Sequence, residues 1–278
     1  MHFDWYQATI LARPEQVLDA LSAGLPDVEM VDGKGLHGYA KLTNVLSAGQ
    51  MVASVLSGGP NGLPNAWATG ERAEPFAAVI RRDFPQHRVT RFDACEDYDE
   101  PGAFDRVCPI LLSLSDKHKL KPQHAGDWHN RTDGATLYLG SPKSAVRTRW
   151  YEKGKQLRKL LLSHGVLRPD WCRLEVQVRP HGTQRLAAAI ASPLEAWGYS
   201  RWTPQVLRVV TAQDVKRAAP STFREPEWRN SYMHMIRQYA GVLQRRYEAI
   251  GSNWEDVGID IGLELKRLIE ENPYNRPN

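Results

Sequence analysis

The chain has 278 residues, of which 42% are hydrophobic and 24% are charged, and its formal net charge at pH 7 is +4. These values are typical of a globular protein that can bury a substantial core. No apolar run approaches the length of a membrane span, and the first residues lack the pattern of a secretory signal, so we expect a cytoplasmic protein without membrane partners. The three cysteines have no CxxC spacing, which favours reduced thiols and argues against a cysteine zinc site.

In chain order, the residue patterns of the first half predict several elements. These are strands over 3–10 and 87–98, helices over 13–25, 71–84 and 102–118, and a β-hairpin over 38–59. Residues 57–70 are rich in Gly and Pro and predict a loop. Pro109 is expected to perturb the helix that contains it, because proline removes a backbone donor.

The second half predicts strands over 135–140, 145–153 and 171–179, a helix over 183–198 that Pro193 kinks or ends, and helices over 225–250 and 254–272. We therefore predict an α+β fold. Residues 1–205 would form a central, mostly antiparallel or mixed sheet with helices packed on it. Residues 206–278 would form a smaller, all-helical C-terminal region.

Positive charge is concentrated in the middle of the chain. Residues 141–185 contain eleven Lys and Arg but only three acidic residues. A protein that binds a phosphate backbone carries its charge in such a cluster. This segment is therefore the candidate for contact with a nucleic acid.

Two carboxylates share one face of the strand that contains residues 91–97. Alternation along a strand places Arg91, Asp93, Cys95 and Asp97 on the same side. Burying two acids together is costly unless a divalent cation lies between them, and carboxylate oxygens suit Mg²⁺ or Mn²⁺. The alternative is an exposed edge strand with solvated acids, and the spacing alone leaves both open.

The strand over 171–179 offers a third carboxylate. Its apolar residues alternate with polar ones, and Glu175 stands between Arg173 and Arg179 on the polar face. This pattern is typical of a salt-bridged surface. It also fits a third metal carboxylate whose neighbouring arginines hold phosphates.

The strand over 145–153 places Arg147, Arg149, Tyr151 and Lys153 on one face. A phenol is a weak nucleophile while it is protonated, and nearby cations favour the phenolate. The same cations can hold a phosphodiester and stabilise charge on its oxygens. The alternative is a structural tyrosine beside cations that only bind DNA.

Taken in order, these three strands resemble the replication initiation factor family of rolling-circle initiators. The family includes staphylococcal plasmid Rep proteins, initiators of filamentous phages and related relaxases. The segments that carry the resemblance are VTRFDACEDYD, TLYLGSPKSAVRTRWYEKGKQ and WCRLEVQV, within residues 1–205. Two positions depart from the family pattern: Pro142 replaces an arginine of the turn, and Cys95-Glu96 replaces an apolar pair.

The resemblance implies a DNA nicking and closing enzyme that uses Mg²⁺ or Mn²⁺. Tyr151 falls at the nucleophilic tyrosine, which would leave a 5′-phosphotyrosine link and a free 3′-OH primer. Asp93, Asp97 and Glu175 fall at the acidic metal-binding positions. The cations expected to contact DNA are Arg91, Lys143, Arg147, Arg149, Lys153, Lys155 and Arg173.

The implied partners are single-stranded or hairpin origin DNA, a host helicase and the replication machinery. The C-terminal helices would either bind origin DNA or mediate homodimer formation. Three other functions stay open: a conjugative relaxase with the same chemistry, a nuclease in which a metal activates water, and an origin-binding regulator without catalysis.

Overall fold

A computed structural model of the chain describes residues 1–219 and 227–271. The chain divides into two compact units, Met1–Thr222 and Phe223–Asn278. The first unit contains a ten-stranded sheet with the strand order β2-β3-β4-β5-β1-β6-β10-β9-β8-β7. All neighbouring strands in this sheet are antiparallel. The α+β fold predicted from the sequence is confirmed.

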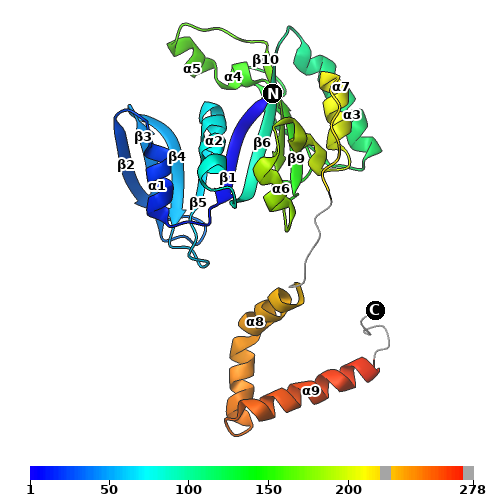
Figure 1. The fold of residues 1–278 in the computed structure, drawn as a ribbon. Coiled ribbons are helices and arrows are strands. Elements are labelled where there is room, and N and C mark those ends of the chain that lie inside the picture. Colours follow the sequence, from blue (N-terminus) through cyan, green and yellow to red (C-terminus); the bar gives the residue numbers. More distant parts are fainter. Residues whose placement is uncertain (220–226, 272–278) are drawn as a thin grey trace. The chain divides into compact units, whose positions relative to one another are not determined.

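The strands are β1 (His2–Thr9), β2 (Val28–Lys34), β3 (Lys41–Ser47), β4 (Gln50–Ser57), β5 (Asn65–Thr69), β6 (Arg88–Asp99), β7 (Pro122–Gly126), β8 (Ala135–Leu139), β9 (Val146–Tyr151) and β10 (Trp171–Val178). The helices of the first unit are α1 (Pro14–Ser22), α2 (Ala73–Asp83), α3 (Ala103–Lys117), α4 (Lys153–Gln156), α5 (Arg158–Ser163), α6 (Gln184–Ile190) and α7 (Thr203–Thr211). Figure 1 shows α2 and α6 lying against the central strands β1 and β6.

One face of the sheet is apolar and forms the core. Every second residue of β10, from Cys172 to Val178, is buried on this face, as the alternation in the sequence predicts. On β9, the Trp150 ring is fully buried, stacks on Phe104 of α3 and donates its indole N–H to the Phe104 carbonyl across 3.2 Å. Successive side chains of a strand point to opposite faces, so the residues between these lie on the other, polar face of the sheet.

Three strands were not predicted from the sequence. β5 lies inside the segment predicted to be a loop, and it pairs with β1 along all five of its residues. β2 and β7 are the two edge strands, and every residue in both is exposed. An exposed edge strand needs no alternation between apolar and polar residues, so its sequence carries no clear strand signal.

The two prolines have different effects. α3 continues through Pro109 to Lys117, so the predicted perturbation does not end the helix. α6 ends at Ile190, and a short 3-10 helix, Leu194–Tyr199, follows Pro193. The prediction that Pro193 interrupts the helix is confirmed.

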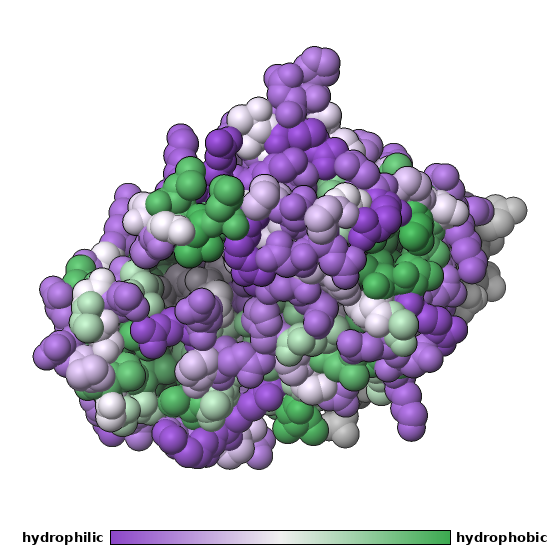
Figure 2. All heavy atoms as spheres, turned by 90° about the horizontal axis from the view of Figure 1, so that it is seen from above, coloured by the Kyte–Doolittle hydropathy of each residue, from purple (hydrophilic) through white to green (hydrophobic). Residues whose placement is uncertain are grey.

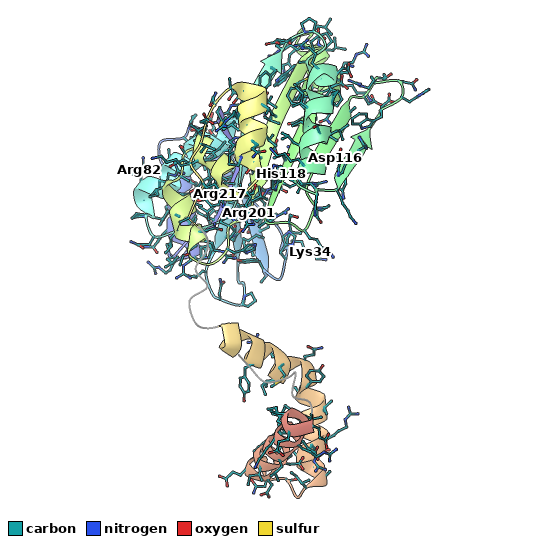
Figure 3. The ribbon with its side chains drawn as sticks, turned by 90° about the vertical axis from the view of Figure 1, so that its right-hand side faces the viewer. Lys34, Arg82, Asp116, His118, Arg201 and Arg217 are labelled. Carbon is teal, nitrogen blue, oxygen red and sulfur yellow. The ribbon has the colours of Figure 1, made fainter. Side chains whose placement is uncertain are left out.

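Residue 205, the predicted end of the first region, lies within α7. The ring of His118, which is labelled in Figure 3 just after α3, contacts the Gln205 side chain of α7 across 2.9 Å. Val206 and Leu207 of the same helix are buried in the core of the first unit, so residues beyond 205 contribute to it.

The second unit contains α8 (Glu227–Ala249) and α9 (Trp254–Glu271), which are joined by an Arg246–Asp260 ion pair of 2.6 Å. Among the described helices, none is long and apolar enough to cross a membrane. The surface seen in Figure 2 is mainly hydrophilic, with separate groups of hydrophobic residues.

Candidate active site

The sheet register brings the three predicted strands together on the polar face. Tyr151 of β9 lies directly opposite Arg173 of β10, which lies directly opposite Asp97 of β6. One position along the face, Glu175 of β10 pairs with both Arg149 of β9 and Cys95 of β6. β6 is central in the sheet, so the alternative of an exposed edge strand is wrong.

Asp4 joins this face from β1, and the sequence patterns did not indicate it. The pairing of β1 with β6 shifts register between Phe3 and Trp5, which leaves Asp4 as the extra residue of a β-bulge. Its carboxylate accepts a hydrogen bond from Arg173 across 2.5 Å and lies 3.7 Å from the Lys153 ammonium. A bulge turns a side chain out of simple alternation, and this one brings Asp4 among the cations.

Each of the three predicted metal carboxylates is paired with an arginine. Arg173 donates two bonds of 2.6 Å to Asp97, and Arg149 donates one of 2.6 Å to Glu175. Arg91 Nε donates to Asp93 across 3.0 Å. Asp93 and Glu175 are both buried, so these pairs supply the counter-charge that buried carboxylates need.

Tyr151 is buried among these ion pairs, with 4% of its surface exposed. The Arg149 guanidinium lies over its ring, 4.7 Å from the centre. Burial and the negative charge of Glu175 raise the pKa of the phenol, although Arg149 and Arg173 act to lower it. The pKa of Tyr151 is therefore raised, whereas the cations alone would lower it. Burial makes the difference, and the sequence pattern did not indicate that burial.

The carboxylates differ in their pKa. Burial, with the negative charges of Asp93 and Asp4, raises the pKa of Glu175 to about 7 despite its bond to Arg149. Burial also raises the pKa of Asp93. For Asp97, burial acts to raise the pKa, but hydrogen bonds from Arg173 and Trp171 outweigh it and the pKa is lowered.

Glu175 should make the protein less stable as the pH rises. Its pKa is about 7 in the folded chain and near 4.5 in an unfolded one. Between these pH values the folded state holds a proton that the unfolded state releases, so a rising pH favours unfolding. We expect the free energy of unfolding of the wild type, relative to Glu175→Gln, to fall from pH 5 to pH 7 and then level off. Urea unfolding at a series of pH values measures this difference. A difference that does not change with pH would contradict the assignment.

A small cavity of about 130 Å³ opens on the same face. Three arginines contribute to its wall together with one acid and other polar groups; the lining residues are Arg91, Tyr138, Arg147, Thr148, Arg149, Glu175 and Gln177. The Arg147 guanidinium stacks on Tyr138 at 3.6 Å, and Nε of Arg147 and of Arg149 is buried with no hydrogen-bond partner among the described residues. Positive charge with unused donors suits an anionic group such as a phosphate.

The remaining predicted cations are more dispersed. The Lys155 ammonium is bound to Glu152 across 2.7 Å, and Glu152 is also held by Arg131, so this group is part of a separate ion-pair network. Lys143 is exposed in the turn between β8 and β9. The structure therefore brings Lys153, but not Lys143 or Lys155, to the group of side chains around Tyr151. We call this group the Tyr151 cluster; it consists of Tyr151, Arg149, Arg173, Asp4, Asp97 and Glu175.

His2, Asp4 and Cys95 form a group that could hold a metal ion. Their ligand atoms lie within 4.8 Å of one another, which makes this the one such group within residues 1–219 and 227–271. Local sequence patterns do not reveal this group, because its residues come from β1 and β6, which are distant in the sequence and paired in the sheet.

The chain is similar to known replication proteins. Residues 88–239 match the replication initiation factor family. Among solved structures, a rolling circle replication initiator protein from Geobacillus stearothermophilus has a similar fold, with a TM-score of 0.51 and 20% sequence identity. The match covers 79% of this chain and 98% of that one. None of the curated proteins compared with the sequence matches it. The family match extends over more than half of the chain and includes β6, β9 and β10, so the protein belongs to the replication initiation factor family.

Proposed function

We propose that this protein initiates rolling-circle replication by nicking and rejoining origin DNA through Tyr151. The observation that carries the proposal is the direct pairing of Tyr151, Arg173 and Asp97 across three adjacent strands. The phenol oxygen would form a bond to phosphorus while the bond from phosphorus to the 3′ oxygen breaks. The phenol loses a proton and the 3′ oxygen gains one, which leaves a 5′-phosphotyrosine and a 3′-OH primer.

The cavity beside Glu175 would hold a phosphate of the DNA strand. Arg91, Arg147 and Arg149 line it with their side chains and would supply positive charge there. Trp5 lies under the Arg91 guanidinium at 4.0 Å, as Tyr138 lies under Arg147. Such aromatic and arginine pairs suit single-stranded DNA, whose bases stack on rings while its phosphates bind cations.

Asp93, Asp97 and Glu175 do not meet as a three-ligand group in the described part of the chain, so the Mg²⁺ or Mn²⁺ that the resemblance implies would be held by two of them. Burial and, after it, the negative charges of Asp93 and Asp4 raise the pKa of Glu175, and a divalent cation would offset both the burial and the repulsion between these carboxylates. We propose that Asp93 and Glu175 hold the ion, with Asp97 at the edge of the site. The ion would supply positive charge to the phosphoryl oxygens. The arginines and Tyr151 would bind and orient the strand.

Arg147 provides a test of the DNA-binding surface. Arg147→Ala should lower the salt dependence of binding to single-stranded origin DNA by about 0.7 in the slope of log K against log salt, the value of one lost phosphate contact. Arg82→Ala is a matched control, because Arg82 lies on α2, exposed and paired only with its neighbour Asp83. Binding is measured by fluorescence anisotropy from low to moderate salt. An unchanged slope for Arg147→Ala would move the binding surface elsewhere.

A covalent adduct assay tests the proposed chemistry. Wild-type protein, Mg²⁺ or Mn²⁺ and a labelled single-stranded origin oligonucleotide should give a protein–DNA adduct that maps to the peptide containing Tyr151. Cleavage without an adduct would favour a hydrolytic nuclease. Specific binding without cleavage under either metal would favour a regulator. A relaxase would give the same adduct, so the presence of a transfer origin on the same element separates it.

We also propose that the two units of the chain have different functions. The sheet-containing unit would be the nicking domain, and the α8–α9 unit would bind origin DNA or mediate homodimer formation. A host helicase and the replication machinery would then use the exposed 3′-OH.

A further inference from the structure

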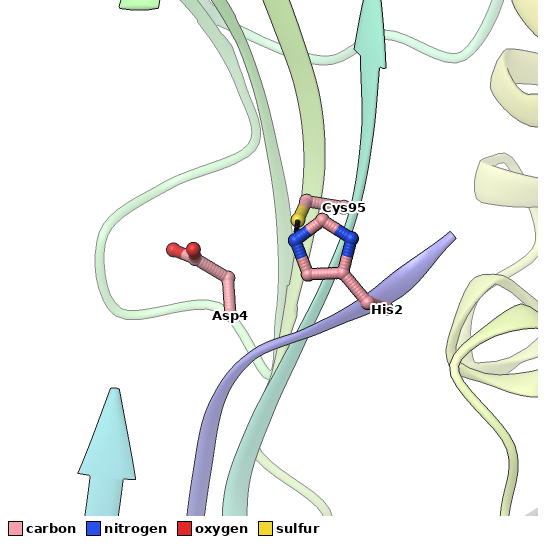
Figure 4. A group of neighbouring side chains, drawn as sticks. All are labelled: His2, Asp4 and Cys95. Carbon is pink, nitrogen blue, oxygen red and sulfur yellow. Dashed lines mark hydrogen bonds between the residues drawn. The ribbon is translucent and has the colours of Figure 1, made fainter. Parts of the chain in front are cut away.

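We propose that His2, Asp4 and Cys95 form a binding site for a borderline divalent ion such as Zn²⁺, separate from the oxygen-donor site for Mg²⁺ or Mn²⁺. His2 lies directly opposite Cys95 in the β1–β6 pair, and the His2 Nε2 atom is 3.1 Å from the Cys95 Sγ atom. The bulge in β1 places Asp4 on the same face as His2 and Cys95, so that it can be the third ligand. Figure 4 shows the His2 imidazole meeting the Cys95 thiol, whereas the Asp4 carboxylate is turned away from the pair in this view.

The three ligands identify the class of ion. Thiolate and imidazole bind Zn²⁺ and similar ions well, whereas Mg²⁺ prefers sites made only of oxygen. In a tetrahedral zinc site, Zn–S of about 2.3 Å and Zn–N of about 2.0 Å give an N to S separation of roughly 3.5 Å. The observed 3.1 Å is close to this value, and the three ligand atoms already lie within 4.8 Å of one another. Small side-chain movements would therefore complete three ligand positions and leave a fourth for water.

The site differs from the one that the cysteine spacing excludes. Cysteine zinc sites contain at least two thiols close in space, but here one thiol is combined with an imidazole and a carboxylate. Cys95 itself is fully buried, whereas His2 and Asp4 are partly exposed, so an ion would enter past these two residues. On binding, the thiol loses its proton to solvent as the bond from sulfur to metal forms.

The ion would share Asp4 with the Tyr151 cluster. Asp4 accepts a hydrogen bond from Arg173, and Arg173 lies opposite Tyr151. A bound ion therefore competes with Arg173 for this carboxylate. We expect Zn²⁺ to slow nicking for this reason, and that expectation rests on the proposed function, whereas the binding of the ion does not.

Cobalt absorption tests the site directly. The full chain is titrated with Co²⁺ in excess Mg²⁺, so that oxygen-only sites are occupied and only a thiolate ligand gives a near-ultraviolet charge-transfer band. We expect one Co²⁺ per chain with this band, and displacement of the Co²⁺ by Zn²⁺. His2→Ala should weaken Co²⁺ binding at least about tenfold, since even indirect partners of metal ligands contribute that much.

The three free cysteines allow a matched comparison. Cys108→Ser/Cys172→Ser removes the two thiols outside the site and should keep the band, whereas Cys95→Ser should lose it. Thermal unfolding of each variant confirms that it is folded. Absence of the band in wild type, or its persistence in Cys95→Ser, would overturn the site. A protein that shows the band but forms no DNA adduct would keep this site and lose the proposed nicking function.

Discussion

Tyr151→Phe is expected to abolish the covalent protein–DNA adduct and to reduce nicking at least about a thousandfold, because it removes the oxygen that we propose as the nucleophile. The substitution keeps the ring, which lies 4.7 Å under the Arg149 guanidinium, and removes only a buried hydroxyl whose pKa is raised by burial. We therefore expect a folded protein that still binds the oligonucleotide. Adduct formation is measured by denaturing electrophoresis, and DNA binding by fluorescence anisotropy.

Tyr98→Phe is the matched control. Tyr98 lies on β6 next to Asp97 but points to the opposite side of the strand, where its ring packs edge-on against Trp150. Its hydroxyl is buried without a hydrogen-bond partner among the described residues, so its loss should cost little stability. Tyr98→Phe should form the adduct at the wild-type rate. Nicking that survives in Tyr151→Phe would rule out Tyr151 as the nucleophile.

Arg173→Met should destabilise the fold by about 3 kcal/mol at pH 7, because it leaves two carboxylates without their main counter-charge. Arg173 is 4% exposed and bonds to Asp97 at 2.6 Å and Asp4 at 2.5 Å. The loss should shrink in acid. Arg173 lowers the pKa of Asp97 below its ordinary 3.8, so this pair stabilises the fold above that pH, and the stabilisation disappears as the pH falls below it.

Arg168→Met is the comparison for this second experiment. Arg168 also pairs with an acid of β6, Asp99, at 2.9 Å, but both side chains are well exposed. Solvent screens such a pair, so its loss should cost less than about 1 kcal/mol. Urea unfolding at pH 7 and at pH 3 gives both values. Equal destabilisation by the two substitutions, or a loss for Arg173→Met that does not change with pH, would show that Arg173 acts only by packing.

Strong alternation made most of the central sheet predictable. β6, β9 and β10 each have one apolar and one polar face, and the side chains fall on the faces that the sequence indicates. The predicted grouping of Tyr151 with Arg149 followed from the same periodicity. Their chemical roles were carried by the family resemblance, and these roles remain proposals.

Other features depend on contacts that the local sequence does not record. Asp4 enters the site through a bulge in β1, and a bulge appears only when the partner strand is known. The raised pKa of Tyr151 depends on burial by neighbouring strands, whereas the sequence shows only the nearby cations. The pairing of His2 with Cys95 likewise depends on the register between two distant segments.

The position of β10 determines when the proposed site around Tyr151 can first be assembled. β10 lies between β6 and β9 in the sheet, although it is synthesised after both of them. Before residues 171–178 have been synthesised, Asp97 of β6 would lack its partner Arg173, and β9 would have no neighbouring strand on that side. If the proposed nicking function holds, incomplete chains would not cut DNA, because the proposed centre is assembled only when this last central strand has been inserted.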